Sequence, residues 1–350
     1  MLKILKIVMV AFKYNHIKEL TLCTVLPSQK KGSDRLKSIA VFEQTTADLG
    51  FLAAQKIIQK KGITPSEIGA LVFLTKTPDY RGPATAMVLQ NRLEIAKDCI
   101  VYDSPTGNLG FENGMNLGAS LLKSITQRFA LVVFGDTISK QLSVEDILEL
   151  PFQDGATAVL LEKGVNTSTV SMFSLTLSEN WSSFMIPSGG FRKNDMFFNQ
   201  LSSKKDQQTA EHLHLDTLKI QDAILPELTI VKNTLSNLIS ELQKPNVSII
   251  VNLFMPELEK QFQSLLKTEA YGQDVYLSSE HIPQTMAATV PLLLERVITE
   301  KKSFPQQIVS VSLGEGLCVN VSNFEVSESS VLETIGSDEF YENGFVTHEM

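Results

Sequence analysis

The stretch from Tyr102 to Ser124, YDSPTGNLGFENGMNLGASLLKS, resembles a turn that delivers a nucleophile to the start of a buried helix. Such turns carry a Cys, or a Ser with a base nearby, because a helix N-terminus favours the anionic form of the nucleophile. This stretch has no Cys, no His and no Ser with a nearby base. The residue types therefore predict a nucleophile site without its nucleophile.

The composition limits which functions are possible. The chain has 350 residues, of which 43% are hydrophobic and 20% charged, as is typical of a globular protein with a large core. Its formal net charge of −8 argues against broad contact with nucleic acid or anionic lipid, since either needs a basic face. No run approaches the roughly 20 apolar residues that a membrane span needs. The opening MLKILKIVMVAF is interrupted by Lys3 and Lys6, and we interpret it as a first strand rather than a signal peptide.

The three cysteines, Cys23, Cys99 and Cys318, are odd in number and widely spaced. This spacing predicts neither a disulfide framework nor a zinc site, and it fits a reducing compartment, so we expect a cytoplasmic protein without a metal. Cys23 and Cys99 fall near strands, without the helix N-terminus that would activate a thiol. Cys318 is expected to be a small buried hydrophobe.

Strand-like and helix-like segments alternate along the first half. Residues 45–63 have apolar residues at helical spacing and end at Gly62, so they predict a helix. Residues 68–77 form a continuous apolar run, the pattern of a strand covered on both faces. The other segments expected in this half are a helix at 84–95, a strand at 99–103, a helix at 110–125 and strands at 129–138 and 155–163.

The same order returns in the second half. Between the halves, residues 166–208 are polar and irregular, and we interpret them as a connection or lid. The later segments are expected to be a helix at 217–242, a strand at 247–254, a helix at 256–269, a strand at 274–278, a helix at 285–301 and strands at 307–315 and 317–326. The predicted division is residues 1–165, a connection at 166–211, residues 212–326 and an acidic extension at 327–350. The repeated order predicts a duplicated α/β unit that builds layered sheets.

Five motifs, in order and spacing, resemble the landmarks of the β-ketoacyl-acyl carrier protein synthase III family of the thiolase fold. They are TPDYRGPATAMVLQNRLEI, VYDSPTGNLGFENGMNLGASLL, FQDGATAVLLEK, ATVPLLLERV and VSVSLGEGL, and the resemblance runs from about Thr45 to about Val326. It implies a five-layered αβαβα architecture, a homodimer or heterodimer, and condensation of acyl thioesters with malonyl-carrier protein.

The resemblance also implies a catalytic Cys, His and Asn, and all three positions are changed. In the family's D-x-x-x-x-C-x-G-F pattern this chain has DSPTGNLGF, which places Asn108 at the Cys. IVNLFM places Asn252 at the His, within a residue or two, and IPQTMAATVP places Gln284 at the Asn. Candidate substrate-binding positions by the same resemblance are Gly107, Asn108, Leu109, Gly314 and Gly316. No cofactor is expected, apart from an acyl-coenzyme A or acyl-carrier protein thioester as a ligand.

These replacements favour a catalytically degenerate subunit that pairs with an active paralogue, as chain-length factors do in polyketide and related lipid systems, or with itself. An acyl carrier protein is a possible second partner. Two alternatives stay open: a condensing enzyme or acyltransferase that works without a covalent Cys intermediate, with the amides as an oxyanion site, and a module that binds a small acyl ligand. A malonyl decarboxylase is disfavoured because the imidazole position is also lost.

Other departures from the family concern surface and terminal residues. His281 lies close to Gln284 in the sequence, but we interpret it as an ordinary surface or packed residue. The Trp- and Arg-containing segment that holds coenzyme A in the family is reduced here to LPSQKKGSDRLKSIA, whose basic residues are interpreted as a solvated loop, with contact to a carrier protein as the alternative. These residues are Lys30, Lys31, Arg35 and Lys37. The tail from Val326 to Met350 has six acidic residues and no Lys or Arg, and extends beyond the family's usual end.

Overall fold

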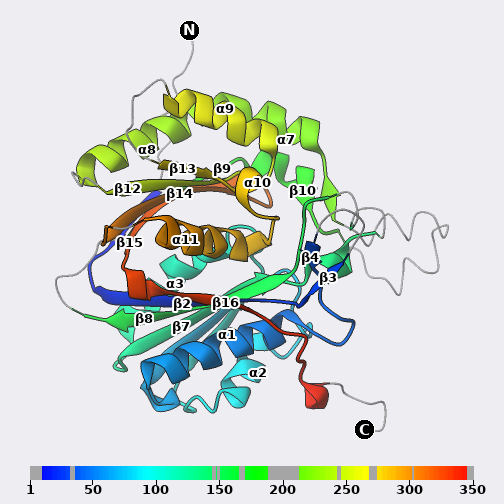
Figure 1. Ribbon diagram of the computed structural model, residues 1–350, viewed down its shortest axis with the longest axis vertical. Helices are drawn as coiled ribbons and strands as arrows, with labels where there is room; N and C mark the ends of the chain where they lie inside the picture. Colours follow the sequence, from blue (N-terminus) through cyan, green and yellow to red (C-terminus); the bar gives the residue numbers. More distant parts are fainter. Residues whose placement is uncertain are drawn as a thin grey trace.

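The computed structural model describes residues 10–31, 36–143, 147, 150–164, 170–187, 213–242, 246–267, 274–301 and 303–344. Within these ranges two six-stranded sheets lie between layers of helices (Figure 1). Helices α7, α8 and α9 cover the outer face of one sheet, α1 and α2 cover the outer face of the other, and α3 and α11 lie between the sheets. The predicted five-layered αβαβα arrangement is confirmed.

The helices begin and end near the predicted residues. Thr45 caps α1 in a capping box with Asp48, and Gly62 ends the helix with a φ of 61°. One predicted helix is divided, because Pro226 lies in a 3-10 turn, Leu225–Glu227, between α7 and α8. The helices are α1 (Thr46–Lys61), α2 (Thr85–Arg92), α3 (Gly110–Ser124), α7 (Thr217–Ile224), α8 (Leu228–Leu242), α9 (Pro256–Lys267), α10 (Ser278–His281) and α11 (Thr289–Glu300).

Each half contributes five strands in equivalent order. In the first sheet the order is β16 (Val331–Gly336), β2 (Ile17–Leu26), β8 (Gly155–Lys163), β7 (Phe129–Asp136), β5 (Ile68–Leu74) and β6 (Ile100–Ser104). In the second it is β1 (Val10–Tyr14), β9 (Val170–Thr176), β15 (Cys318–Val326), β14 (Gln306–Gly314), β12 (Val247–Asn252) and β13 (Asp274–Leu277). Two short hairpins complete the described strands: β3 (Gln29–Lys31) with β4 (Leu36–Ser38), and β10 (Phe184–Met185) with β11 (His214–Leu215).

The central strands are buried because helices cover both of their faces. In β7, Ala130, Val132 and Phe134 pack in the core between the two sheets, while Leu131 and Val133 pack under α1 and α2. A strand that alternates between two apolar cores shows no polar alternation. This is why β5, β7 and β12 appear in the sequence as continuous apolar runs.

The structure differs from the predicted division at β1 and at β9. Strand β1 leaves its own half and pairs antiparallel with β9, whereas residues 1–9 lie outside the described residues. The segment interpreted as a connection or lid contains β9, which pairs with both β1 and β15, so an irregular connection is wrong for Val170–Thr176. Residues 165–169 and 188–212 are outside the described part. Strands β1 and β15, which pair with β9, lie far from it in the sequence, so the pairing could not be predicted locally.

The C-terminal tail is not a free acidic extension over its described length. Strand β16 pairs parallel with β2 and continues the first sheet, and Gln44 Nε2 holds the next residues by donating to the carbonyls of Ser337 and Glu339, both at 2.9 Å. Further on, the ring of Tyr341 lies 4.5 Å from the guanidinium of Arg92. The tail thus closes over the N-terminal end of α1.

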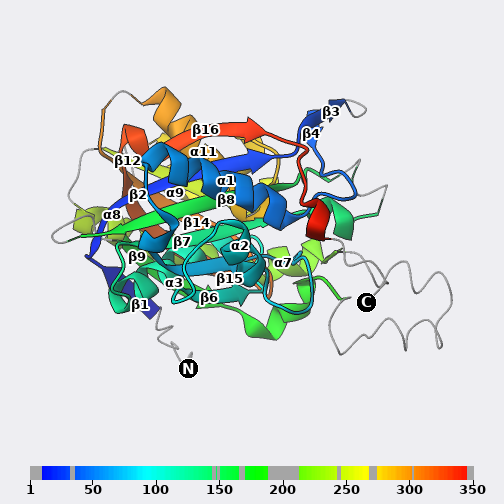
Figure 2. The same cartoon turned by 90° about the horizontal axis from the view of Figure 1, so that it is seen from below.

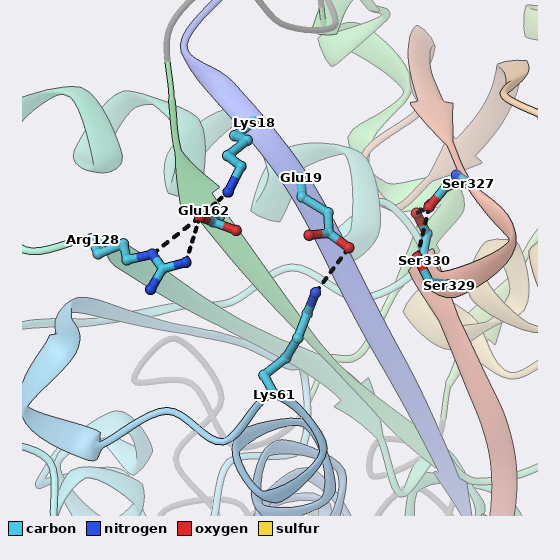
Figure 3. A network of polar contacts seen from close by, with 8 residues as sticks. All are labelled: Lys18, Glu19, Lys61, Arg128, Glu162, Ser327, Ser329 and Ser330. Atoms are coloured by element: carbon cyan, nitrogen blue, oxygen red, sulfur yellow. Dashed lines mark hydrogen bonds and ion pairs between the residues drawn. The ribbon is translucent and has the colours of Figure 1, made fainter.

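Polar contacts secure the strands near β16 and β2 (Figure 3). Glu162 of β8 accepts from Lys18 at 2.8 Å and from Arg128, also at 2.8 Å. Glu19 pairs with Lys61 of α1 at 2.8 Å. The backbone N–H of Ser327 donates to the Ser330 hydroxyl at 2.9 Å, which fixes the turn into β16. These contacts hold elements that are remote in the sequence in one sheet.

Candidate active site

The turn between β6 and α3 places Asn108 inside the molecule. Gly110 N donates to Gly107 O at 2.8 Å, and α3 begins at Gly110. A Cβ on Gly110 would lie 2.6 Å from the Cβ of Ala287, so only glycine lets the helix approach the second half this closely. Asn108 is 1% exposed as a result.

The three predicted positions Asn108, Asn252 and Gln284 converge. Asn252 Nδ2 lies 3.5 Å from Asn108 Oδ1, and Gln284 Nε2 donates to Asn252 Oδ1 at 3.0 Å. All three side chains are buried. Residues separated by 144 and 32 positions in the sequence therefore form one chain of amides.

Each amide comes from a different element. Asn252 is the last residue of β12, and Asn108 lies in the turn that precedes α3. Gln284 is held by its backbone, because its N–H donates to Pro151 O and its carbonyl accepts from Gln153 N, both at 2.8 Å. The loop after β13 is thereby fixed to the segment before β8.

The amide chain is anchored at both ends by hydrogen bonds within the protein. Asn108 Nδ2 donates to the carbonyl of Leu313 in β14. Gln284 Nε2 donates to Ser278 Oγ at 2.6 Å, and its Oε1 accepts from Thr289 Oγ1 at 3.2 Å. Carboxamides neither titrate near neutral pH nor attack thioesters, so this arrangement can orient and polarise a group but supplies neither a nucleophile nor a base.

A buried carboxylate, Glu259, lies behind the amide chain. Its Oε1 accepts from Ser278 Oγ at 2.5 Å and from Leu253 N at 3.1 Å, and its Oε2 accepts from Ser279 N at 2.9 Å. Burial raises the pKa of Glu259, and these hydrogen bonds act in the opposite direction. Sequence reasoning missed this residue, although a charge at the spacing of Phe262 and Leu266, on the apolar face of α9, was a signal for it.

Two further carboxyls lie in the core near the turn. Glu112 of α3 accepts from Ser312 Oγ at 2.5 Å and from Ser310 Oγ at 3.1 Å, and burial raises its pKa. Asp136 ends β7 and accepts from Lys76 N at 2.6 Å and from Thr75 Oγ1 at 3.0 Å. Burial, chiefly, and the nearby Glu315 raise the pKa of Asp136 to about 8. Asp136 is therefore protonated at neutral pH.

The predicted substrate-binding positions lie where β14 meets the turn. A Cβ on Gly314 would lie 2.5 Å from the Leu109 side chain, so this glycine permits close contact between strand and turn. Gly316 has a φ of 70° in the turn between β14 and β15. Between these two glycines stands Glu315, whose Oε1 accepts from Asn108 N at 3.2 Å. Contact with a substrate stays a prediction for these positions, and Glu315 was not predicted.

The remaining candidate residues lie apart from this chemistry. The ring of His281 packs 5.8 Å from that of Tyr276, and burial lowers the pKa of His281. Burial raises the pKa of Cys23 to about 11 and that of Cys99 to about 12, so both stay thiols. Cys318 is not the buried hydrophobe that was expected: it is half-buried, with its Sγ 3.2 Å from the hydroxyl of Ser174, because β9 brings a polar residue beside it.

The basic residues considered for a carrier protein are only partly described. Arg35 lies outside the described residues, as do the side chains of Lys30 and Lys31. Lys37 Nζ donates to the carbonyls of Ile147 and Leu150, both at 2.6 Å, so its ammonium is held by the protein rather than solvated in a loop. Among the described residues, no group of three or more His, Cys, Asp or Glu side chains could hold a metal ion. No helix in the same part of the chain is both long and apolar enough to cross a bilayer.

Comparisons with known proteins find similar sequences and a similar fold. The family model for 3-oxoacyl-[acyl-carrier-protein (ACP)] synthase III matches residues 102–180, which include the turn. The chain is 36% identical over 129 residues to the β-ketoacyl-[acyl-carrier-protein] synthase III of Rhizorhabdus wittichii, and 34% identical over 128 residues to that of Serratia proteamaculans. These matches cover 37% and 36% of this chain, and the chain spans only 40% of the length of each relative.

The similarity in three dimensions is more extensive. A 3-oxoacyl-(acyl-carrier protein) synthase of Burkholderia xenovorans superposes with a TM-score of 0.80 at 21% identity, over 94% of this chain and 99% of that one. A 3-oxoacyl-[acyl-carrier-protein] synthase III of Aquifex aeolicus superposes with a TM-score of 0.69 at 18% identity, over 89% of this chain and 100% of that one. The chain therefore has the fold of these synthases, and its residues 102–180 are similar to the 3-oxoacyl-[acyl-carrier-protein (ACP)] synthase III family.

Proposed function

We propose that this chain is a catalytically degenerate ketosynthase III-like subunit that pairs with an active condensing enzyme in fatty acid, polyketide or related lipid biosynthesis. The observation that carries the proposal is the buried chain Asn108–Asn252–Gln284, at the positions where the resemblance expects Cys, His and Asn. Three amides hydrogen-bonded to one another can form no acyl-enzyme. They fill the former reaction centre with neutral, mutually satisfied groups.

The assembly part of the proposal rests on the edge strand β6. β6 has one neighbour, β5, and its other edge is unpaired within the described residues (Figure 2). Large apolar side chains are exposed on it and on the adjacent helices: Tyr102 is 55% exposed, Met87 of α2 50% and Leu117 of α3 39%. An open sheet edge with exposed apolar groups favours association, since burial removes both from water. An active paralogue, or a second copy, covers this edge, and an acyl carrier protein serves the active subunit.

Intact-mass spectrometry tests the chemical part. After incubation with acetyl-coenzyme A, the purified chain should gain no acyl mass, because Asn108 offers no thiolate. An active ketosynthase III treated in parallel is the positive control. The single variant Asn108→Cys should acylate slowly and should not condense, since Asn252 and Gln284 supply no imidazole. An adduct on residues 102–111 of the wild-type chain would overturn the proposal.

Size-exclusion chromatography with light scattering tests the assembly. Co-expressed with an active paralogue, the chain should form a one-to-one complex whose catalysis depends on the paralogue's Cys. Tyr102→Glu should weaken this complex because it introduces a charge at the β6 edge, whereas Leu218→Glu, at a residue of α7 that is 74% exposed, should not. A wild-type chain that stays monomeric at all concentrations and ignores the paralogue would refute the pairing.

A further inference from the structure

The side chain of Glu315 occupies the turn at Asn108 from the opposite half of the molecule. Glu315 lies between β14 and β15, and its Oε1 accepts from the backbone N–H of Asn108 at 3.2 Å. This contact joins residues 207 positions apart. The half-buried carboxylate of Glu315 therefore accepts the hydrogen bond from the backbone N–H of Asn108, the residue at the nucleophile position.

The fit of this carboxylate depends on Gly107. A Cβ on Gly107 would overlap Glu315 Oε1 and would lie 3.0 Å from Lys76 Cγ. The carboxylate therefore uses space that is available only because residue 107 is glycine. Strand β14, which precedes Glu315, also contacts the side chain of Asn108, since Asn108 Nδ2 donates to Leu313 O. β14 and its turn thus satisfy both the side chain and the backbone N–H of Asn108.

The charges around Glu315 allow an anion in this position. Asp136 is the buried carboxyl that interacts with Glu315, and it is protonated at neutral pH. Its proton removes the repulsion that two carboxylates would otherwise exert in a poorly solvated site. The Cγ of Lys76 also lies beside Gly107 at this position. The negative charge of Glu315 therefore meets no second negative charge from Asp136.

We propose that the carboxylate of Glu315 occupies a binding site for a small carboxylate or acyl group at the backbone N–H of Asn108. An external ligand binds there only when Glu315 is displaced. A carboxylate oxygen and an acyl carbonyl oxygen make the same demand on a backbone donor, so they compete for it. The inference rests on the proposed function, because it explains how the unreactive turn is also closed to acyl groups.

The test is acetate binding to the full chain, measured by isothermal titration against chloride at equal ionic strength. Glu315→Ala should bind acetate at least tenfold more tightly than the wild type, since the freed N–H and the vacated space suit one carboxylate. Glu315→Gln should show no gain, because its carboxamide oxygen keeps the place. Glu328→Ala, at an exposed carboxylate after β15, is the matched control and should also show none.

Two results would overturn the inference: Glu315→Ala binding acetate no more tightly than the wild type, or the control Glu328→Ala gaining as much as Glu315→Ala. If Glu315→Ala does not fold, amide resonances of the wild type and Glu315→Gln decide instead. The Asn108 amide proton should lie further downfield in the wild type, because a charged acceptor strengthens the hydrogen bond. Equal shifts would refute the contact. An acyl adduct on the wild-type chain would remove the accessory role but would leave the acetate result to be judged separately.

Discussion

Replacing Asp136 with Asn should make the stability of the protein less dependent on pH. Asp136 is fully buried, and its pKa is raised from 3.8 to about 8, mainly by burial. A carboxyl with a raised pKa holds its proton in the folded state at pH values where the unfolded chain has lost it. Its contribution to stability is therefore complete below pH 3.8 and declines as the pH rises towards 8.

The size of the effect follows from the length of this window. Each pH unit inside it lowers the free energy of unfolding by about 1.4 kcal/mol, so wild type should lose about 4 kcal/mol between pH 4 and pH 7 through this group alone. Asparagine carries no proton to lose. Its Oδ1 can still accept from Lys76 N and Thr75 Oγ1, while its Nδ2 replaces an oxygen that has no partner among the described residues. Asp136→Asn should match wild type at pH 4 and exceed its stability at pH 7.

Urea unfolding at pH 4, 5.5, 7 and 8.5, followed by circular dichroism, measures the difference between the two proteins. Other buried carboxyls with raised pKa values, such as Glu112 and Glu259, act equally in both and cancel. Glu315→Gln is an informative companion: without the Glu315 charge the pKa of Asp136 falls, so the window should close at lower pH. Parallel stability curves for wild type and Asp136→Asn would refute the reasoning.

Three further predictions concern single contacts, each measured by urea unfolding at pH 7. Arg92→Ala should cost about 3–5 kcal/mol, because it leaves Asp48 buried without its ion-pair partner at 2.8 Å, whereas Arg296→Ala, at an exposed pair, should cost less than about 1 kcal/mol. Equal losses would contradict the burial argument. Gly135→Ala should cost about 3 kcal/mol or more, since its Cβ would overlap the backbone of Gly155 and Ala156, and Gly62→Ala, with no atom within 4 Å, should cost only about 1–2 kcal/mol for its positive φ. A mild Gly135→Ala phenotype would mean that β7 and β8 can separate. Glu162→Gln should cost at most about 1 kcal/mol, because the Lys18 and Arg128 side chains that donate to it are about half exposed; burial alone would raise the pKa of Glu162, but these donors lower it, so the loss should vanish as the pH falls below 4.5. A loss that persists in acid would assign it to packing.

Local patterns predicted most of the elements for a physical reason. Helix α1 was predicted from its apolar spacing and its two ends, because Thr45, Asp48 and Gly62 act within one turn of where they stand. Strands β5 and β7 were predicted from apolar runs, since helices cover both faces. The position of Asn108 followed from the Gly110–Phe111 pair that starts α3. The division of the helix at Pro226 was also visible in the sequence but was not recognised.

The remaining features depend on contacts between distant residues. β9 and β16 are strands because β1, β15 and β2 offer them open edges, and no short window of sequence contains both partners. The contact of the Glu315 carboxylate with Gly107 and Asn108 likewise forms only when two turns from opposite halves of the molecule meet.

The sequence by itself determined that this chain has two similar α/β halves and that amides stand where the resemblance expects a nucleophile, a base and a donor. Both conclusions depend on residue identity and local spacing, which are written in short segments. Only the tertiary structure decided that Asn108, Asn252 and Gln284 hydrogen-bond in one chain, and that Glu259 and Glu315 adjoin it. Hydrogen bonds act over about 3 Å, and that proximity between remote segments exists only once the two sheets pack around α3 and α11.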